Sequence, residues 1–328
     1  MRHLSWLVVA ATLAGLAAGL WAIGLVGLGE ILGVIARLGL GSSLLILASS
    51  LVVLGALGAA WSMSMRAGPR RWGLFVWGRA AREAANDLLP FSQLGGLVVG
   101  LRTVTGGGIE RPRAYAATIV DLLTEMIAQL LLTLVALVLF GALLVSPAAP
   151  ASLATIAWSG LAGVALIAGA LAFLQRPALR FAAPLVGRMI PGGEQVVDAV
   201  RAELAAFMAT RGAILPPLLW NVAAWLLSVG AAWLILVLLD APLPFVRVLG
   251  IEALIFAIRS SAFVVPGALG VQEAGYALLG PIFGLDRETA LALSLVKRAR
   301  DVGIGLPTLL VWQLLEVRRA RYAGSSAQ

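Results

Sequence analysis

The sequence predicts an all-α, polytopic integral membrane protein with about six to eight transmembrane helices. Of its 328 residues, 61% are hydrophobic and only 12% are charged, and the mean hydropathy is +0.99. Soluble domains contain about 45–50% apolar and about 25% charged residues. Long apolar runs recur along the chain, separated by short loops that carry arginine. Because no long polar block interrupts them, we expect residues 1–328 to form one transmembrane domain.

The composition excludes several kinds of chemistry. The chain has no cysteine, and His3 is its only histidine, so thiolate catalysis, histidine triads and ordinary zinc sites are excluded. We expect neither a cofactor nor a metal. The net charge of +8 comes almost wholly from arginine, since Lys297 is the only lysine. These arginines lie in short loops, which favours contact with anionic lipid head groups and not with nucleic acid.

The apolar runs predict the order of the helices. A retained first helix is expected at residues 4–28 and a second at 38–63. Five arginines between residues 66 and 82 place the following loop, and with it the amino terminus, in the cytoplasm. Further helices are expected at residues 115–144, 153–174, 215–239 and 246–265.

The loops and the carboxyl terminus complete this topology. Uncharged residues 146–152 and the tight turn at 240–244 are expected outside the cell. Apolar residues recur at helical spacing within 196–208, between charged ones, which predicts an amphipathic helix at the cytoplasmic interface. That helix is either a solvated connector or a docking surface for a partner. Three arginines after residue 317 place the carboxyl terminus in the cytoplasm as well.

Two apolar segments break their own helices. Residues 86–102 read NDLLPFSQLGGLVVGLR and contain Pro90 and Gln93; residues 263–280 read FVVPGALGVQEAGYALLG and contain Pro266 and Gly270. Proline and glycine interrupt helices, and lipid cannot satisfy the backbone groups that are then released. We therefore expect two discontinuous or re-entrant elements that line protein or a water-filled cavity.

The second broken segment also carries polar side chains at membrane depth. Gln272 and Glu273 lie in its apolar run. An ionisable residue inside a membrane is by default a functional candidate. Glu273 therefore either lines a central cavity or is a structural acid, paired with an arginine in a kinked and packed helix.

The spacing of the two segments suggests an internal repeat. Arg82 lies eight residues before Pro90, and Arg259 lies seven before Pro266. The halves would be roughly residues 1–150 and 151–328, and two broken elements would meet at one site, as in transporters built from repeats. Chance is the alternative, because the chain contains 37 glycines and 15 prolines.

Further charges occur within predicted helices. Asp121 and Glu125 share one helix face and are candidates for an ion or proton relay. The alternative is pairing with the nearby arginines 102, 111 or 113, which we favour for Asp121 while leaving Glu125 open.

The basic cluster of Lys297, Arg298 and Arg300 would cost about 2.5–3.5 kcal/mol per residue in lipid. These side chains either reach the interface or hold a polar head group. Lys297 can pair with Asp301, four residues on. Arg298 and Arg300 lie about 200° apart on an ideal helix, so both face a cavity only if Gly303 and Gly305 break the helix.

The runs VPGALGVQEAGYALLGPIFGL and ALALSLVKRARDVGIGLPTLLVWQ resemble the hopanoid-associated membrane proteins (HpnL-type). These belong to a wider flippase-like family that includes the membrane region of lysylphosphatidylglycerol synthases. NDLLPFSQLGGLVVG is similar to that family's first motif, although Gly96 follows Gly95 where many relatives carry a glutamate. The resemblance implies a bacterial inner-membrane protein that moves a lipid, with a hopanoid as the cargo.

Three functions compete at this point. The first is a lipid translocator whose partners are membrane lipids, with the polar head group held in a central cavity. The second is a membrane transferase with Glu273 or Glu125 as base. The third is a scaffold for lipid-biosynthesis enzymes that transports nothing. The expected substrate-binding residues are Glu273, Gln272, Arg298, Arg300, Arg259, Gln93, Pro90, Pro266 and Gly270.

Overall fold

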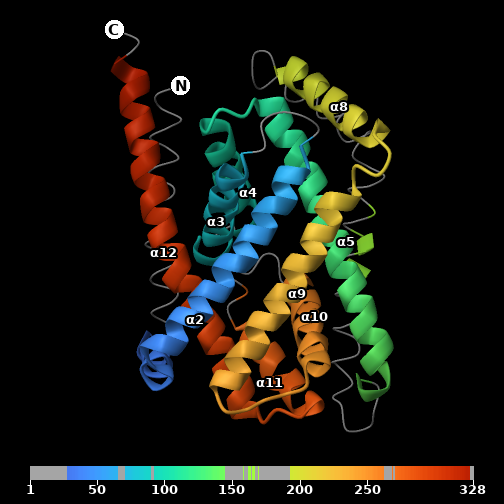
Figure 1. Ribbon diagram of the computed structural model, residues 1–328, viewed down its shortest axis with the longest axis vertical. Coiled ribbons are helices and arrows are strands. Elements are labelled where there is room, and N and C mark those ends of the chain that lie inside the picture. Colours follow the sequence, from blue (N-terminus) through green and yellow to red (C-terminus); the bar gives the residue numbers. More distant parts are fainter. Residues whose placement is uncertain are drawn as a thin grey trace.

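The computed structural model describes residues 28–65, 71–89, 92–144, 193–261 and 270–325, with isolated positions at 158, 162–163, 165–166, 169 and 268. Every regular element in these residues is an α-helix, which confirms the predicted fold class. Figure 1 shows the helices gathered into one elongated bundle. They are α2 (Leu28–Met63), α3 (Trp72–Leu88), α4 (Ser92–Gly106), α5 (Arg111–Leu144), α8 (Gly193–Ala209), α9 (Leu215–Leu238), α10 (Phe245–Ser261), α11 (Val271–Phe283) and α12 (Arg287–Ser325).

Three described helices are long and apolar enough to cross a membrane. The candidate spans are Leu38–Met63 in α2, Arg111–Gly141 in α5 and Leu215–Leu238 in α9. They coincide with three of the runs predicted as transmembrane helices. α2 also extends toward the amino terminus through a kink at Gly39, whose φ of 77° is a conformation that glycine adopts without a steric penalty.

Two helical hairpins enter the bundle from opposite ends, α3–α4 in the upper half of Figure 1 and α10–α11 in the lower half. After α3, Leu89 takes an extended conformation; before α11, Gly270 has a φ of 76°. Both breaks fall in the segments that the sequence predicts to be discontinuous. The four helices have only 13 to 17 residues each. That is fewer than the ~20 that a helix needs to span the hydrocarbon core.

Glycine allows close packing around the first hairpin. A Cβ atom on Gly58 of α2 would lie 2.5 Å from the backbone of Val76 in α3. A Cβ atom on Gly96 of α4 would lie 2.6 Å from the carbonyl oxygen of Arg82 in α3. Small residues at such contacts let helix backbones approach each other in membranes.

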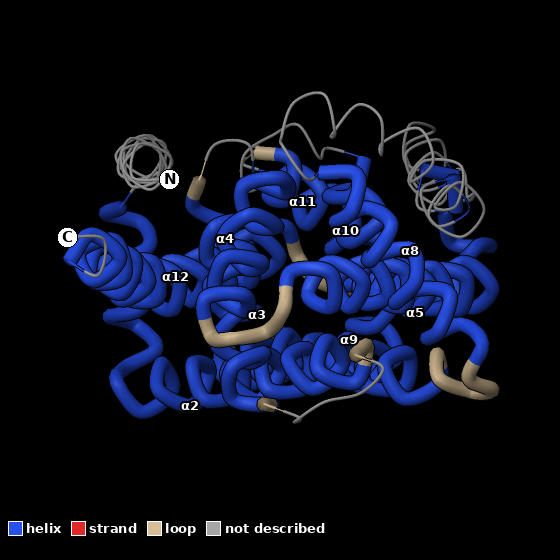
Figure 2. Tube along the Cα trace, turned by 90° about the horizontal axis from the view of Figure 1, so that it is seen from above, coloured by secondary structure: helices blue, strands red, loops and turns tan. Residues whose placement is uncertain are grey.

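α12 is the longest described helix, with 39 residues, and runs along α2 and α3 (Figures 1 and 2). Its start is capped by Asp286, whose Oδ1 accepts a hydrogen bond from the backbone N–H of Thr289 at 2.8 Å. Hydrogen bonds from the hydroxyl and backbone of Thr289 lower the pKa of the Asp286 carboxyl. The helix continues without a break through Gly303, Gly305 and Pro307.

The amphipathic pattern in residues 196–208 forms α8, which lies at one end of the bundle (Figure 1). Its apolar face packs on α5. The buried residues of this contact are Val197, Val200, Leu204 and Phe207 from α8, and Ala116 and Val120 from α5. The predicted helices at 4–28 and 153–174 and the external turn at 146–152 lie outside the described residues, apart from single positions.

Candidate functional site

The two hairpins meet inside the bundle, at the end of each hairpin where its two helices are separated by the break. Arg259, near the end of α10, places Nη2 3.4 Å from Oδ1 of Asp87, near the end of α3. Each of these helices has 17 residues and is therefore about 25 Å long. Since the hairpins enter from opposite ends, this ion pair lies deep in the bundle.

Glu273 lies in the first turn of α11, and its partner Arg298 acts on Asp301 as Arg259 does. Its Oε1 accepts a hydrogen bond from Nη2 of Arg298 in α12 at 3.0 Å. Arg298 is buried, whereas 18% of the Glu273 side chain is exposed. Oε2 of Glu273 has no hydrogen-bond partner among the described residues. The arginine pairing considered from the sequence is therefore present, and one carboxylate oxygen remains able to accept another donor.

Two other predicted site residues, Gln272 and Arg300, are hydrogen-bonded to side chains of α12. Gln272 is fully buried and donates from Nε2 to Oγ of Ser294 at 3.0 Å, which joins α11 to α12. Arg300 donates from Nε and Nη2 to Oδ1 of Asp301, at 2.9 and 2.6 Å. Because α12 is unbroken here, Arg300 does not share the partner of Arg298.

We call Asp87, Arg259, Glu273, Arg298, Arg300 and Asp301 the tip cluster.

Lys297 belongs to a separate buried group. Its Nζ donates to Oε2 of Glu252 at 2.5 Å and to the Tyr276 hydroxyl at 2.7 Å, and that hydroxyl in turn donates to Oε1 of Glu252. The ion pair between Lys297 and Asp301 that the sequence permits is not formed. Glu252, Tyr276 and Lys297, from α10, α11 and α12, are referred to below as the triad.

The charges of these two groups balance when their carboxylates, arginines and lysine are ionised and Tyr276 is neutral. The tip cluster contributes three acids and three bases, and the triad contributes one of each. The run around residues 297–300 suggests exposed cations that attract an anion on their own. In the structure, each of these cations is instead paired with a carboxylate. Any head group that binds an arginine here competes with a carboxylate already in place.

Asp121 and Glu125 lie elsewhere, in a buried cluster between α3 and α5. Nη2 of Arg79 lies 2.5 Å from Oε1 of Glu125, and its Nη1 lies 3.2 Å from Oδ2 of Asp121. Arg82 reaches the same two carboxylates at 3.1 and 3.2 Å. Nε of Arg79 also lies 2.8 Å from Glu83. These five residues are the α3–α5 cluster.

The sequence suggested other arginines as partners for these acids, and that assignment is wrong. Arg102 pairs with Glu316 of α12 at 2.6 Å, and Arg113 lies 3.3 Å from Glu203 of α8. The partners are Arg79 and Arg82 of α3. The sequence does hold a signal for Arg79, because Arg79, Glu83 and Asp87 repeat every four residues. That spacing puts ionisable groups on one helix face and marks a charged seam.

The remaining predicted site residues fall at the hairpin breaks. Pro90 and Pro266 lie outside the described residues, as does the side chain of Gln93. Gly270 is the N-cap of α11. Within the described part of the chain, no three acidic or histidine side chains converge so that they could hold a metal ion.

Comparison with known proteins gives one match. The sequence profile of the family described as the lysylphosphatidylglycerol synthase TM region matches residues 7–307, which is nearly the whole chain. No curated protein and no solved structure matches the chain significantly. The matched range contains both hairpins, the tip cluster and the triad. The chain therefore belongs to the family of the lysylphosphatidylglycerol synthase transmembrane region.

Proposed function

We propose that the chain is a lipid translocator of the bacterial inner membrane. It moves a lipid with a polar head group between the leaflets, in hopanoid or related lipid transport. The family makes a role with membrane lipids the natural starting point. The movement itself is inferred from the two hairpins and from the charges between them.

The tip cluster is the observation that carries this proposal. Three acids and three arginines lie where two short hairpins meet inside the bundle. An ionisable side chain inside a membrane domain is by default a candidate for a functional site. Discontinuous helices that meet near the midplane are also the usual substrate site of transporters built from repeats.

We assign the direct contacts to Glu273, Arg298 and Arg259. An arginine offers a rigid fork of donors to phosphate or hydroxyl oxygens. The unpartnered Oε2 of Glu273 accepts a hydrogen bond from a hydroxyl or ammonium of the same head group. Gln272 is bonded to Ser294, so its role is to position α11. Arg300 supplies positive charge beside the site and is held by Asp301.

Reconstitution of the purified protein in liposomes tests this function. A labelled phospholipid is placed in one leaflet, and its arrival in the other is measured by extraction into albumin. Movement without chemical change supports a translocator, and a modified lipid supports a transferase. If the lipid is neither moved nor modified, both functions are overturned and a scaffold for lipid-biosynthesis enzymes is favoured.

Glu273→Gln keeps the shape of the side chain and removes its charge. We expect lipid movement to fall about tenfold or more, because a charge-assisted hydrogen bond contributes about 1.5–3 kcal/mol. Glu288→Gln, at an exposed position near the start of α12, is the matched control and should move lipid normally. A folded Glu273→Gln variant that moves lipid at the normal rate would remove Glu273 from the site.

A further inference from the structure

The triad joins three ionisable side chains in one closed ring of hydrogen bonds. Each member comes from a different helix, and each is buried, with 0% exposure for Tyr276, 5% for Lys297 and 9% for Glu252. Lys297 also lies 5.4 Å from the centre of the Tyr276 ring. A buried ion pair costs several kcal/mol of desolvation. Well-packed apolar residues at the same positions often give a protein that is equally or more stable. Stability alone therefore does not account for a lysine at this depth.

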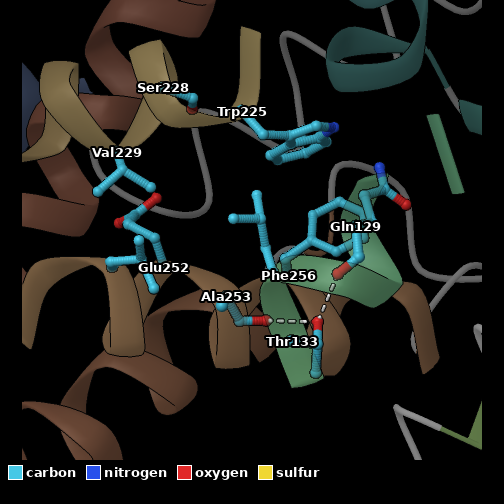
Figure 3. A pocket seen from close by; sticks show the side chains of 10 residues that line it. Gln129, Thr133, Trp225, Ser228, Val229, Glu252, Ala253 and Phe256 are labelled. Carbon is cyan, nitrogen blue, oxygen red and sulfur yellow. Dashed lines mark hydrogen bonds between the residues drawn. The ribbon is translucent and has the colours of Figure 1, made fainter. Parts of the chain in front are cut away.

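One member of the triad also borders a cavity. A space of about 20 Å³ lies between α5, α9 and α10, which is enough for a single water molecule. Figure 3 shows Glu252 at one edge of this space and Gln129 and Trp225 on the opposite side. Ser228 and Thr133 line it as well.

The lining offers polar partners to a water molecule. Nε1 of Trp225 is buried and has no hydrogen-bond partner among the described residues. Ser228 and Glu252 line the same space. A buried water needs two to four such partners. The cavity therefore has room for one water molecule beside Glu252.

The triad is built into the same helices as the tip cluster. Tyr276 lies one turn after Glu273 in α11, and Lys297 precedes Arg298 in α12. Glu252 lies two turns before Arg259 in α10. A change in how the triad holds these three helices together therefore acts directly on the side chains that we assign to the head group.

We propose that the triad is a proton-binding site linked to head-group binding. The cavity water gives one proton to a carboxylate oxygen of Glu252 and takes another from solvent, so the water is unchanged and the triad gains one proton. Lys297 keeps its charge but loses its counter-charge. This inference rests on the proposed function, because it explains how lipid movement responds to protons.

The charge balance gives the direction of the linkage. With Glu252 ionised, the tip cluster and the triad together hold four acids and four bases. With Glu252 neutral, the bases exceed the acids by one, which favours an anionic head group. Linkage is reciprocal, so an anionic lipid must in turn favour proton uptake.

The other charged groups around the triad come from the tip cluster. The positive charges of Arg259 of α10 and Arg300 of α12 act on the triad. The negative charges of Asp87 of α3 and Asp301 of α12 offset those of the two arginines. Glu273 lies on α11. α9 carries no charged residue within Leu215–Leu238, and the part of α5 that lines the cavity is neutral.

Spectroscopy tests the proton site without any need for lipid movement. Infrared difference spectra of the whole protein in nanodiscs are recorded between about pH 5 and about pH 9. We expect a protonated carboxyl band that Glu252→Gln abolishes and Glu288→Gln retains. Because Lys297 is the only lysine, lysine labelled with ¹⁵N at Nζ reports on its side-chain amine alone. Its signal should shift over the same pH step.

A binding measurement tests the linkage. Nanodiscs of phosphatidylglycerol and of phosphatidylcholine are compared through the pH at the midpoint of the carboxyl band. We expect phosphatidylglycerol to raise that midpoint and phosphatidylcholine to leave it lower. Equal midpoints in the two lipids would overturn the linkage to an anionic head group.

The double variant Glu252→Gln, Lys297→Met protects the test against misfolding. It removes both charges, so no unpaired ion is left buried, and it should fold when either single variant does not. In liposomes, a pH gradient should change lipid flux several-fold in the natural protein and should not change it in the folded double variant. A retained response in that variant, or no Glu252-dependent band, would overturn the proton site. No lipid flux in the natural protein would overturn the proposed function instead.

Discussion

The α3–α5 cluster illustrates how single residues hold charge inside this bundle. Arg79 is 1% exposed and lies within 3.2 Å of three carboxylates, those of Glu83, Asp121 and Glu125. Asn221 of α9 donates to the hydroxyl of Thr124 next to them, at 3.0 Å. The cluster therefore holds α3 against α5, and the hydrogen bond between Asn221 and Thr124 holds α5 against α9.

Removal of one partner should expose what such a cluster contributes. Arg79→Met leaves its carboxylates buried with less positive charge, which costs about 3–5 kcal/mol for a broken buried pair. We expect a much lower midpoint of thermal unfolding in detergent. Arg113→Met is the matched control, because Arg113 is 43% exposed where it pairs with Glu203. Surface pairs contribute about 0–1 kcal/mol. Similar losses from both changes would contradict this reading of the cluster.

At the scale of elements, the two hairpins depend on backbones that approach closely. The sequence reveals the breaks, since Pro90 and Pro266 interrupt apolar runs. It does not reveal which helix each hairpin packs against. That depends on contacts such as the one between Gly58 of α2 and Val76 of α3.

Gly58→Ala tests the contact between α2 and α3. The added Cβ would lie 2.5 Å from the Val76 backbone, so the helices must move apart. We expect a loss of about 1–3 kcal/mol, seen as a lower unfolding midpoint. Gly230→Ala in α9 is the control, because nothing lies within 4 Å of its Cβ position. It should be neutral or slightly stabilising, since alanine favours helices. If Gly58→Ala is as stable as the control, the two helices do not pack this closely.

At the scale of the whole molecule, arginine is unevenly distributed between the two ends of the bundle. The end that carries α8 and the carboxyl-terminal part of α12 holds arginines 71, 111, 113, 201, 211, 318, 319 and 321 among the described residues, whereas the opposite end holds arginines 37, 247 and 287. The positive-inside rule places the first end in the cytoplasm. This orientation is a prediction.

Single cysteines can test the orientation cleanly because the chain has none of its own. Thr210→Cys, after α8, and Glu288→Cys, at the start of α12, lie exposed at opposite ends. In cells with a permeabilised outer membrane, we expect an impermeant maleimide to label Glu288→Cys alone. Thr210→Cys should react only after the inner membrane is opened. A reporter fused after Gln328 that is active only in the periplasm would contradict the same topology.

The sequence by itself determined the class of the protein and the positions of its unusual segments. Apolarity above that of soluble domains required helices that satisfy their own backbone groups. The proline and glycine runs marked both helix breaks, and the motifs around Glu273 pointed to the family. These are local properties, which composition and short-range sterics decide.

Only the tertiary structure decided which charges meet. Lys297 pairs with Glu252, 45 residues away, and not with Asp301 in its own helix. Asp121 and Glu125 meet Arg79 and Arg82 across two helices. Tyr276 completes the triad with no signal of its own in the sequence. In a low-dielectric interior each buried charge needs a partner, and several partners satisfy the same local pattern. The packing of the hairpins against α5 and α12 selects among them.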